Sequence, residues 1–191
     1  INKALVAAIA VAGGRAVGIS GKDGGLIQAR KLMAVSKSDD DAARGAIDLG
    51  YVGEPAHIDT RVIEALNAAR LIPVVAPIGV GAAGETFNIN ADTSAGAIAA
   101  ALGATRMLML TDVPGVLDGD GKLITELTVS EAEALIRDGT VSGGMIPKVE
   151  TCINAVLGGA EAAVIMDGRV RHALLVELFT EHGIGTFIKA D

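Results

Sequence analysis

The sequence predicts an α/β fold: an open three-layer αβα sandwich with a mostly parallel central sheet. Apolar strand-like runs alternate with helix-like stretches along most of the 191 residues, which is the order expected when helices cover a parallel sheet. Half of the residues are apolar, yet there are only three Phe, one Tyr and no Trp. The core must therefore be built from Ala, Val, Ile and Leu, which suits buried parallel strands. The length fits a single domain, 1–191, either as one large body or as two lobes.

The first third of the chain predicts a helix, a strand and a hairpin. Residues 1–12 have helical periodicity that a glycine pair stops, and the apolar run 16–20 follows as a strand. In 26–57, two short β-like pieces flank the charged run 39–41. We interpret this segment as a β-hairpin flap.

The middle of the chain alternates between helix and strand. Asp59 can cap a helix over 60–70, and 71–78 is a buried strand whose prolines place it near a sheet edge or make its ends irregular. Asp92 begins the next helix, and 106–110 is another apolar strand. This order supports a parallel sheet.

The last third repeats the pattern. Thr128 and Glu131 have the spacing of a capping box, so 129–138 should form a short helix. Further helices are expected over 147–157 and 172–182, and strands over 163–166 and 185–188.

Charge and composition exclude several classes of partner. The formal net charge of −7 argues against nucleic acid and against an anionic membrane surface, because both need a basic patch. No apolar run approaches the roughly 20 residues of a membrane-spanning helix. The single Cys152 cannot form an internal disulfide and fits an inert core thiol in a reducing compartment. We expect a cytoplasmic protein with a small-molecule partner.

One segment puts polar side chains at a helix start, where unpaired N–H groups and the helix dipole favour anions. Asn88, Asn90 and Asp92 alternate, so an extended backbone points them to one side. Two amides and a carboxylate suit a polar ligand and the orientation of a cation. Ordinary turn and capping chemistry explains the same residues, and both interpretations stay open at this point.

A second segment, 142–148, also enters a helix. Gly143 and Gly144 let backbone N–H groups approach phosphate oxygens, and Lys148 adds a positive charge in the first helical turn. The alternative is a plain loop before a helix with proline at its first position. Taken together, the two segments predict a phosphoryl-transfer site. The histidines, His57, His172 and His182, have no metal-ligand spacing, so no metal site is expected.

These residues resemble the amino acid kinase family, and within it the branch that phosphorylates N-acetyl-L-glutamate in arginine biosynthesis. The segments that carry the resemblance are 17–23, 72–79, 88–92, 143–148 and 183–186. The resemblance implies the amino acid kinase fold and ATP-dependent phosphorylation of the γ-carboxylate of N-acetyl-L-glutamate. It also implies Mg²⁺ carried by the ATP phosphates.

The resemblance implies roles for individual residues. Lys148 would stabilise the transferring phosphoryl group, Asp92 would hold the catalytic lysines in place, and Asn88 with Asn90 would bind the substrate. The residues expected against ATP are Thr111, Asp112, Gly143, Gly144 and Met145. Those expected at a feedback site for L-arginine are His172, Glu177, Gly183 and Gly185.

Part of the family pattern has no match in the chain: an N-terminal strand with a lysine before paired glycines, a second Gly-rich loop and a substrate-binding arginine. We therefore expect an N-terminally incomplete kinase domain that is inactive by itself. The alternatives are another family member such as a carbamate kinase, a non-catalytic arginine-sensing module, or a nucleotide-binding subunit. A homo-oligomer is expected, and association with a PII-type regulator stays open.

Overall fold

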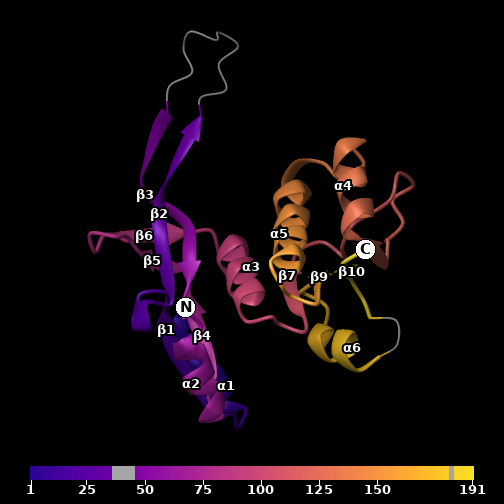
Figure 1. The fold of residues 1–191 in the computed structure, drawn as a ribbon. Coiled ribbons are helices and arrows are strands. Elements are labelled where there is room, and N and C mark those ends of the chain that lie inside the picture. Colours follow the sequence, from indigo (N-terminus) through magenta and orange to yellow (C-terminus); the bar gives the residue numbers. More distant parts are fainter. Residues whose placement is uncertain (36–45, 181–182) are drawn as a thin grey trace. The chain divides into compact units, whose positions relative to one another are not determined.

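The computed structural model describes residues 1–35, 46–180 and 183–191, and the chain divides into two compact units, 1–94 and 95–191 (Figure 1). The described strands form a two-stranded sheet and a closed four-stranded barrel in the first unit, and a four-stranded sheet in the second. Parallel neighbours occur in all three, so the predicted α/β class is confirmed. No helix within the described ranges is both long and apolar enough to cross a membrane.

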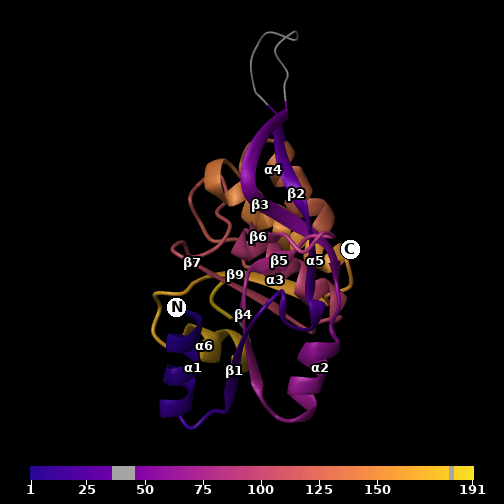
Figure 2. The same cartoon turned by 90° about the vertical axis from the view of Figure 1, so that its left-hand side faces the viewer.

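In the two-stranded sheet of the first unit, an amide side chain of α1 bonds to both strands. β1 and β4 pair in parallel, and α1 contacts both strands while α2 contacts β4 (Figure 2). The Asn2 Nδ2 donates to Ile19 O at 3.1 Å and to Val74 O at 2.7 Å. The elements of this unit are α1 (Asn2–Val11), β1 (Ala16–Ser20), β2 (Ile27–Val35), β3 (Ala46–Ile58), α2 (Arg61–Ala68), β4 (Ile72–Ala76), β5 (Ile78–Val80) and β6 (Thr86–Ile89).

The strand predicted over 71–78 is two strands in two different sheets. β4 ends before Pro77 and pairs with β1, whereas β5 begins after Pro77 and joins the barrel. Proline has no N–H to donate to a ladder and fixes its own φ, so the chain changes direction there. The apolar run alone carried no signal for this break.

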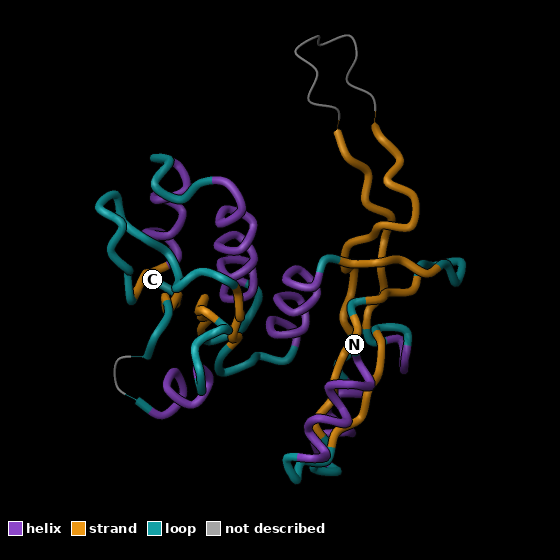
Figure 3. The backbone as a smooth tube through the Cα atoms, turned by 180° about the vertical axis from the view of Figure 1, so that it is seen from behind, coloured by secondary structure: helices purple, strands orange, loops and turns teal. Residues whose placement is uncertain are grey.

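The barrel brings the predicted hairpin and the Asn88 segment together. β2 and β3 pair antiparallel, β3 pairs with β6, β6 with β5, and β5 closes the ring onto β2. Figure 3 shows these strands in orange, crossing close to one another. The centre is tight: a Cβ added at Gly53 would lie 2.7 Å from the Phe87 Cβ, and one at Gly79 would lie 2.7 Å from the Ala29 Cβ. The charged run 39–41 lies outside the described residues.

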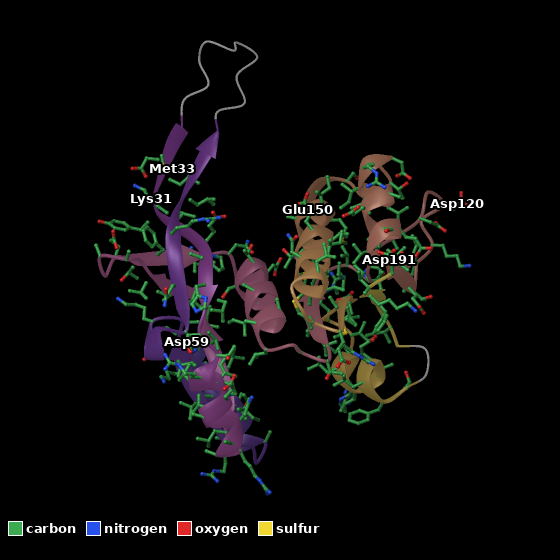
Figure 4. All side chains as sticks on the ribbon, in the orientation of Figure 1. Lys31, Met33, Asp59, Asp120, Glu150 and Asp191 are labelled. Carbon is green, nitrogen blue, oxygen red and sulfur yellow. The ribbon has the colours of Figure 1, made fainter. Side chains whose placement is uncertain are left out.

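The predicted cap of α2 is wrong by one position. Thr60 occupies the N-cap, and Asp59 lies just before it, where its Oδ1 accepts from the Arg61 N–H at 3.2 Å (Figure 4 labels Asp59). The Arg61 guanidinium also binds the Asp59 carboxylate and lowers its pKa to about 2. Asp59 therefore pairs with the first helical residue instead of forming the cap itself.

In the second unit, helices cover both faces of the sheet, as the predicted sandwich requires. Ala163 and Ile165 of β9 share a buried cluster with residues of α4 and α5. Val164 and Met166 share another with Ala173 of α6, because successive strand residues point to opposite faces. The order across the sheet is β7-β9-β10-β8. The elements are α3 (Ala91–Ala101), within which the two units divide, β7 (Met107–Thr111), β8 (Glu126–Thr128), α4 (Val129–Arg137), α5 (Ile146–Leu157), β9 (Ala162–Asp167), α6 (Ala173–Phe179) and β10 (Thr186–Lys189).

Two other details of the second unit depart from the sequence prediction. The helix expected over 172–182 is shorter, because His172 has a left-handed φ of 62° and Thr180 is extended. His182 lies outside the described residues. β8 is only three residues long and was not predicted. Cys152 is buried, as its apolar surroundings indicated.

The capping box at the start of α4 is confirmed. The Thr128 Oγ1 accepts from the Glu131 N–H at 3.3 Å, and Glu131 Oε2 accepts from the Thr128 N–H at 2.8 Å. We expect Thr128→Ala to destabilise the protein by about 1 kcal/mol, because it leaves a helical N–H unpaired. Urea unfolding followed by circular dichroism measures this loss. Thr128→Ser keeps the cap and is the control, and equal stability of the two variants would contradict the prediction.

Candidate active site

Asn88 is held by the barrel and faces solvent. Along β6, Phe87 and Ile89 are buried while Thr86 and Asn88 are exposed, the alternation of a strand with one covered face. The backbone of Asn88 lies opposite Val52 of β3 and Ile78 of β5. The sheet thus fixes the position from which this amide projects.

Asn90 caps the next helix, so the capping interpretation holds for this residue. Its Oδ1 accepts from the Thr93 N–H at 3.1 Å and from the Thr93 Oγ1 at 3.4 Å. Asp92 follows in the first turn of α3 and is half-buried. Because the Asn90 Oδ1 accepts hydrogen bonds from α3, the NH₂ group is the part of this side chain that can donate to a ligand.

Two loops of the second unit enclose a largely apolar cavity of about 200 Å³. One loop follows β7 and the other precedes α5. Of the five residues expected against ATP, only Met145 is in the lining; Thr111 and Asp112 come just before it in the chain, and Gly143 and Gly144 lie between Ser142 and Met145. The lining residues are Val113, Pro114, Gly115, Val116, Leu117, Thr140, Val141, Ser142 and Met145. Apolar walls with a few polar groups are typical of a site for a flat organic group such as a purine.

The glycines before α5 leave open space in front of its N-terminus. Gly143 has a φ of 56°, and a Cβ added at Gly143 or Gly144 would meet no other group within 4 Å. Lys148 lies half-buried in the first turn of α5. α5 begins at Ile146, so Pro147 is its second residue and not its first. The Met145 and Ile146 N–H groups already donate to Ser142 O and Gly143 O. The feature of this helix start that suits an anion is therefore the Lys148 cation close to glycines with open space around them.

The carboxyl ends of β7 and β9 bring together polar groups, two of which, Asp167 and Arg169, the sequence did not predict. Thr111 lies opposite Asp167, and its Oγ1 donates to Asp112 Oδ1 at 3.2 Å. Asp167 in turn binds the guanidinium of Arg169, which lowers the pKa of this carboxyl to about 2. The Asp-Gly-Arg turn directly after an apolar strand is the signal that could have identified Arg169.

A second cavity, of about 310 Å³, contains most of the predicted effector residues. Glu177 is only 6% exposed, and its Oε2 accepts from the Ile184 N–H at 2.9 Å. The Arg106 guanidinium, which was not predicted, lies 5.4 Å from the centre of the Phe187 ring and donates to Glu177 O at 3.5 Å. The full lining is Arg106, Thr125, Glu126, Glu177, Thr180, Gly183, Gly185 and Phe187.

His172 is not among the residues that line this cavity. Its Nε2 accepts from the Arg171 Nε–H at 3.1 Å, and its left-handed backbone places it just before α6. Within the described part of the chain, no three His, Cys, Asp or Glu side chains gather as they would around a metal ion.

Comparison with known proteins identifies the family. The model of the amino acid kinase family matches residues 1–167. The chain belongs to this family. Solved structures confirm the amino acid kinase fold: smu.665 from Streptococcus mutans UA159 is 30% identical with a TM-score of 0.75, over 99% of this chain and 66% of that one. Carbamate kinase from Giardia lamblia bound to AMP-PNP shares the fold at 18% identity and a TM-score of 0.65, over 100% of this chain and 71% of that one.

Curated relatives of this amino acid kinase are more similar in sequence. Acetylglutamate kinase from Acidiphilium cryptum is 65% identical over 190 residues, which is 100% of this chain and 64% of that protein. Acetylglutamate kinase from Gluconacetobacter diazotrophicus is 63% identical over 191 residues, which is 100% of this chain and 61% of that protein. The chain thus spans less than two thirds of the length of these relatives.

Proposed function

We propose that this chain forms part of an acetylglutamate kinase, which transfers the γ-phosphoryl group of ATP to the γ-carboxylate of N-acetyl-L-glutamate in the cytoplasm. The observation that carries the proposal is the 65% identity to an acetylglutamate kinase along the whole chain. Carbamate kinase, the alternative, is supported only by likeness of fold. Because the relatives are longer, we propose that activity also needs the part that the chain does not cover.

The chemistry fits the residues at hand. A γ-carboxylate has a reference pKa of about 4.3, so it is already an anion at neutral pH and needs no general base. The barrier comes from bringing this anion to a polyphosphate, and positive charge and N–H donors lower it. Lys148 supplies a charge and the start of α5 supplies N–H groups. Asp92 then acts as an organiser of cationic groups and not as a proton acceptor.

The remaining roles follow from where the residues lie. Asn88 binds the α-carboxylate of the substrate, and Asn90 contributes its NH₂ group. The adenine enters the 200 Å³ cavity, where Met145 is part of the wall. Thr111 and Asp112 face the ribose side, and Gly143 and Gly144 approach the phosphates. Mg²⁺ arrives bound to the ATP phosphates.

The test restores the missing part. A fusion protein, called the joined protein below, combines this chain with the part of the Acidiphilium cryptum acetylglutamate kinase that has no counterpart in the chain. ADP release is measured with N-acetyl-L-glutamate, L-glutamate, carbamate or no acceptor. We expect turnover only with N-acetyl-L-glutamate, and none by the 191-residue chain alone. Robust turnover by the chain alone would overturn the claim of incompleteness. Turnover with carbamate would replace the assignment as an acetylglutamate kinase by that of a carbamate kinase. Nucleotide binding without any turnover would replace it by that of a nucleotide-binding subunit.

We further propose that the 310 Å³ cavity binds L-arginine as a feedback inhibitor, in a homo-oligomeric enzyme. The buried carboxylate of Glu177 suits a guanidinium, and Gly183 and Gly185 belong to the same lining. The absence of a side chain at Gly183 lets the chain approach the Glu177 carboxylate, because a Cβ there would clash with Glu177 Oε2. A structure similar to this chain, N-acetylglutamate synthase from Neisseria gonorrhoeae, was solved in complex with coenzyme A and L-arginine, which supports the choice of ligand. It is 26% identical, with a TM-score of 0.77, over 93% of this chain and 38% of that one.

Calorimetry on the joined protein tests this second proposal. L-citrulline, which carries a neutral urea group in place of the guanidinium, should bind at least about tenfold more weakly than L-arginine, because the charge-assisted hydrogen bonds are lost. Glu177→Gln should narrow this difference, and Glu126→Gln, which alters another carboxylate of the same lining, is the control. Absence of L-arginine binding would remove the proposal.

A further inference from the structure

The carboxyl ends of β7 and β9 form one continuous polar edge. The two strands are parallel and in register, with Thr111 opposite Asp167. Just beyond them, the Gly168 N–H donates to Thr111 O at 2.9 Å, so the turn after β9 is fastened to the end of β7. A Cβ added at Gly168 would lie 3.0 Å from the Leu110 Cβ, which shows how closely the turn approaches β7. The side chain that follows this turn is thereby brought to the edge.

That side chain is Arg169, and Asp167 fixes its orientation. Asp167 Oδ1 accepts from the Arg169 Nε–H at 2.9 Å and from the Arg169 backbone N–H at 2.8 Å. Asp167 Oδ2 accepts from the Nη2–H at 2.8 Å. This bidentate geometry holds the guanidinium plane, although the arginine side chain is 69% exposed. A guanidinium has five N–H donors, so three remain that the Asp167 carboxylate does not use.

Asp112 places an acceptor beside these donors. Its carboxylate accepts from the Thr111 hydroxyl, and its charge contributes to raising the Arg169 pKa, after the larger effect of Asp167. Val113, the next residue, is the first in the lining of the 200 Å³ cavity. Asp112 thus directly precedes the lining, to which neither Asp112 nor Arg169 belongs, and the two side chains are available to the sugar of a nucleotide whose base occupies the cavity.

We propose that Arg169 and Asp112 together bind the ribose diol of the nucleotide, that they select ribonucleotides over deoxyribonucleotides, and that Asp167 is the positioning residue for Arg169. This inference rests on the proposed use of ATP. Each hydroxyl of a diol both donates and accepts a hydrogen bond. Asp112 accepts from the diol and Arg169 donates to it.

The charges of this edge favour a neutral diol over a phosphate. Two carboxylates, Asp112 and Asp167, face one guanidinium, so the cluster carries net negative charge and repels a polyphosphate. The phosphates are instead served by the N-terminus of α5 and Lys148. A neutral diol can accept from Arg169 and donate to Asp112 without bringing a further negative charge to this edge.

The test compares ligands that differ by one hydroxyl. Calorimetry measures the dissociation constants of ADP and 2′-deoxy-ADP for the joined protein, and steady-state kinetics measures the ratio of kcat/KM for ATP and 2′-deoxy-ATP. We expect the ribonucleotide to be preferred at least about tenfold, as for a hydrogen bond to a charged group. Arg169→Ala and Asp167→Asn should each reduce that preference severalfold, because they weaken ADP binding more than binding of 2′-deoxy-ADP, which has only the 3′-hydroxyl.

The ratio separates recognition from mere loss of structure. A purely structural role of the Asp167 pair would weaken both nucleotides equally and leave their ratio unchanged. Arg137→Ala removes another exposed ion pair of the same unit, with Glu133, and should not alter the ratio. An unchanged ratio in Arg169→Ala would overturn the inference while turnover with N-acetyl-L-glutamate continued to support the kinase. A changed ratio without such turnover would support the inference and contradict the kinase.

Discussion

Replacing Lys148 by Ala should lower kcat of the joined protein at least about 100-fold with N-acetyl-L-glutamate and ATP. This is the order of loss when one preorganised donor is removed from a developing anionic transition state. The charge that Lys148 adds to the first turn of α5 is needed most while the phosphoryl group transfers. ADP affinity, measured by calorimetry, should therefore change much less than kcat, because ADP lacks that group.

Two further variants make the Lys148 result specific. Lys148→Arg keeps the positive charge but replaces a compact ammonium by a planar fork, so it should recover only part of the activity. Lys122→Ala removes an exposed lysine from the loop after β7 and should retain full activity. If Lys148→Ala kept kcat within threefold of the original, the role of this lysine in phosphoryl transfer would be refuted.

The local features of the chain could be predicted from sequence, because they depend on neighbouring residues. Thr128 and Glu131 form their capping box through contacts three residues apart, and β9 is a short apolar run with clear ends. The order of helices and strands follows from such signals. The break at Pro77 was not predicted, because a continuous apolar run does not show whether it forms one strand or two strands of different sheets.

The two cavities could be predicted only in part, since each combines segments distant in sequence. The resemblance placed Thr111, Asp112 and the loop before α5 against ATP, and the cavity is lined by Met145 of that loop and by 113–117, the residues that directly follow Asp112. Arg106 and Phe187 are 81 positions apart in the sequence, and nothing local to either residue indicates their stacking. Arg169 was not predicted as a site residue, because its location beside Thr111 and Asp112 depends on the register between β7 and β9.

Thr186 should be among the most sensitive positions for stability in the second unit. Its side chain is fully buried, accepts from the Val116 N–H at 2.8 Å and donates to Ile124 O at 2.6 Å. Thr186→Val preserves shape but removes both bonds, so two main-chain groups lose a partner. We expect a loss of about 2–4 kcal/mol in unfolding free energy. Thr186→Ser keeps the hydroxyl and should cost about 1 kcal/mol for the missing methyl.

Thr186→Val also tests what holds the loop 113–117 at the cavity proposed for the adenine. Thr186 in β10 fastens the loop 113–117 to the sheet, and Gly115 approaches it so closely that an added Cβ would lie 2.6 Å from the Thr186 Oγ1. In Thr186→Val, the Val116 amide should therefore lose hydrogen-exchange protection more than the amides of β9, and ADP affinity should fall with it. Thr186→Ser should preserve both. If Val116 remained protected in Thr186→Val, the loop would be held by the packing of its apolar side chains, and the hydroxyl would contribute little to the nucleotide site.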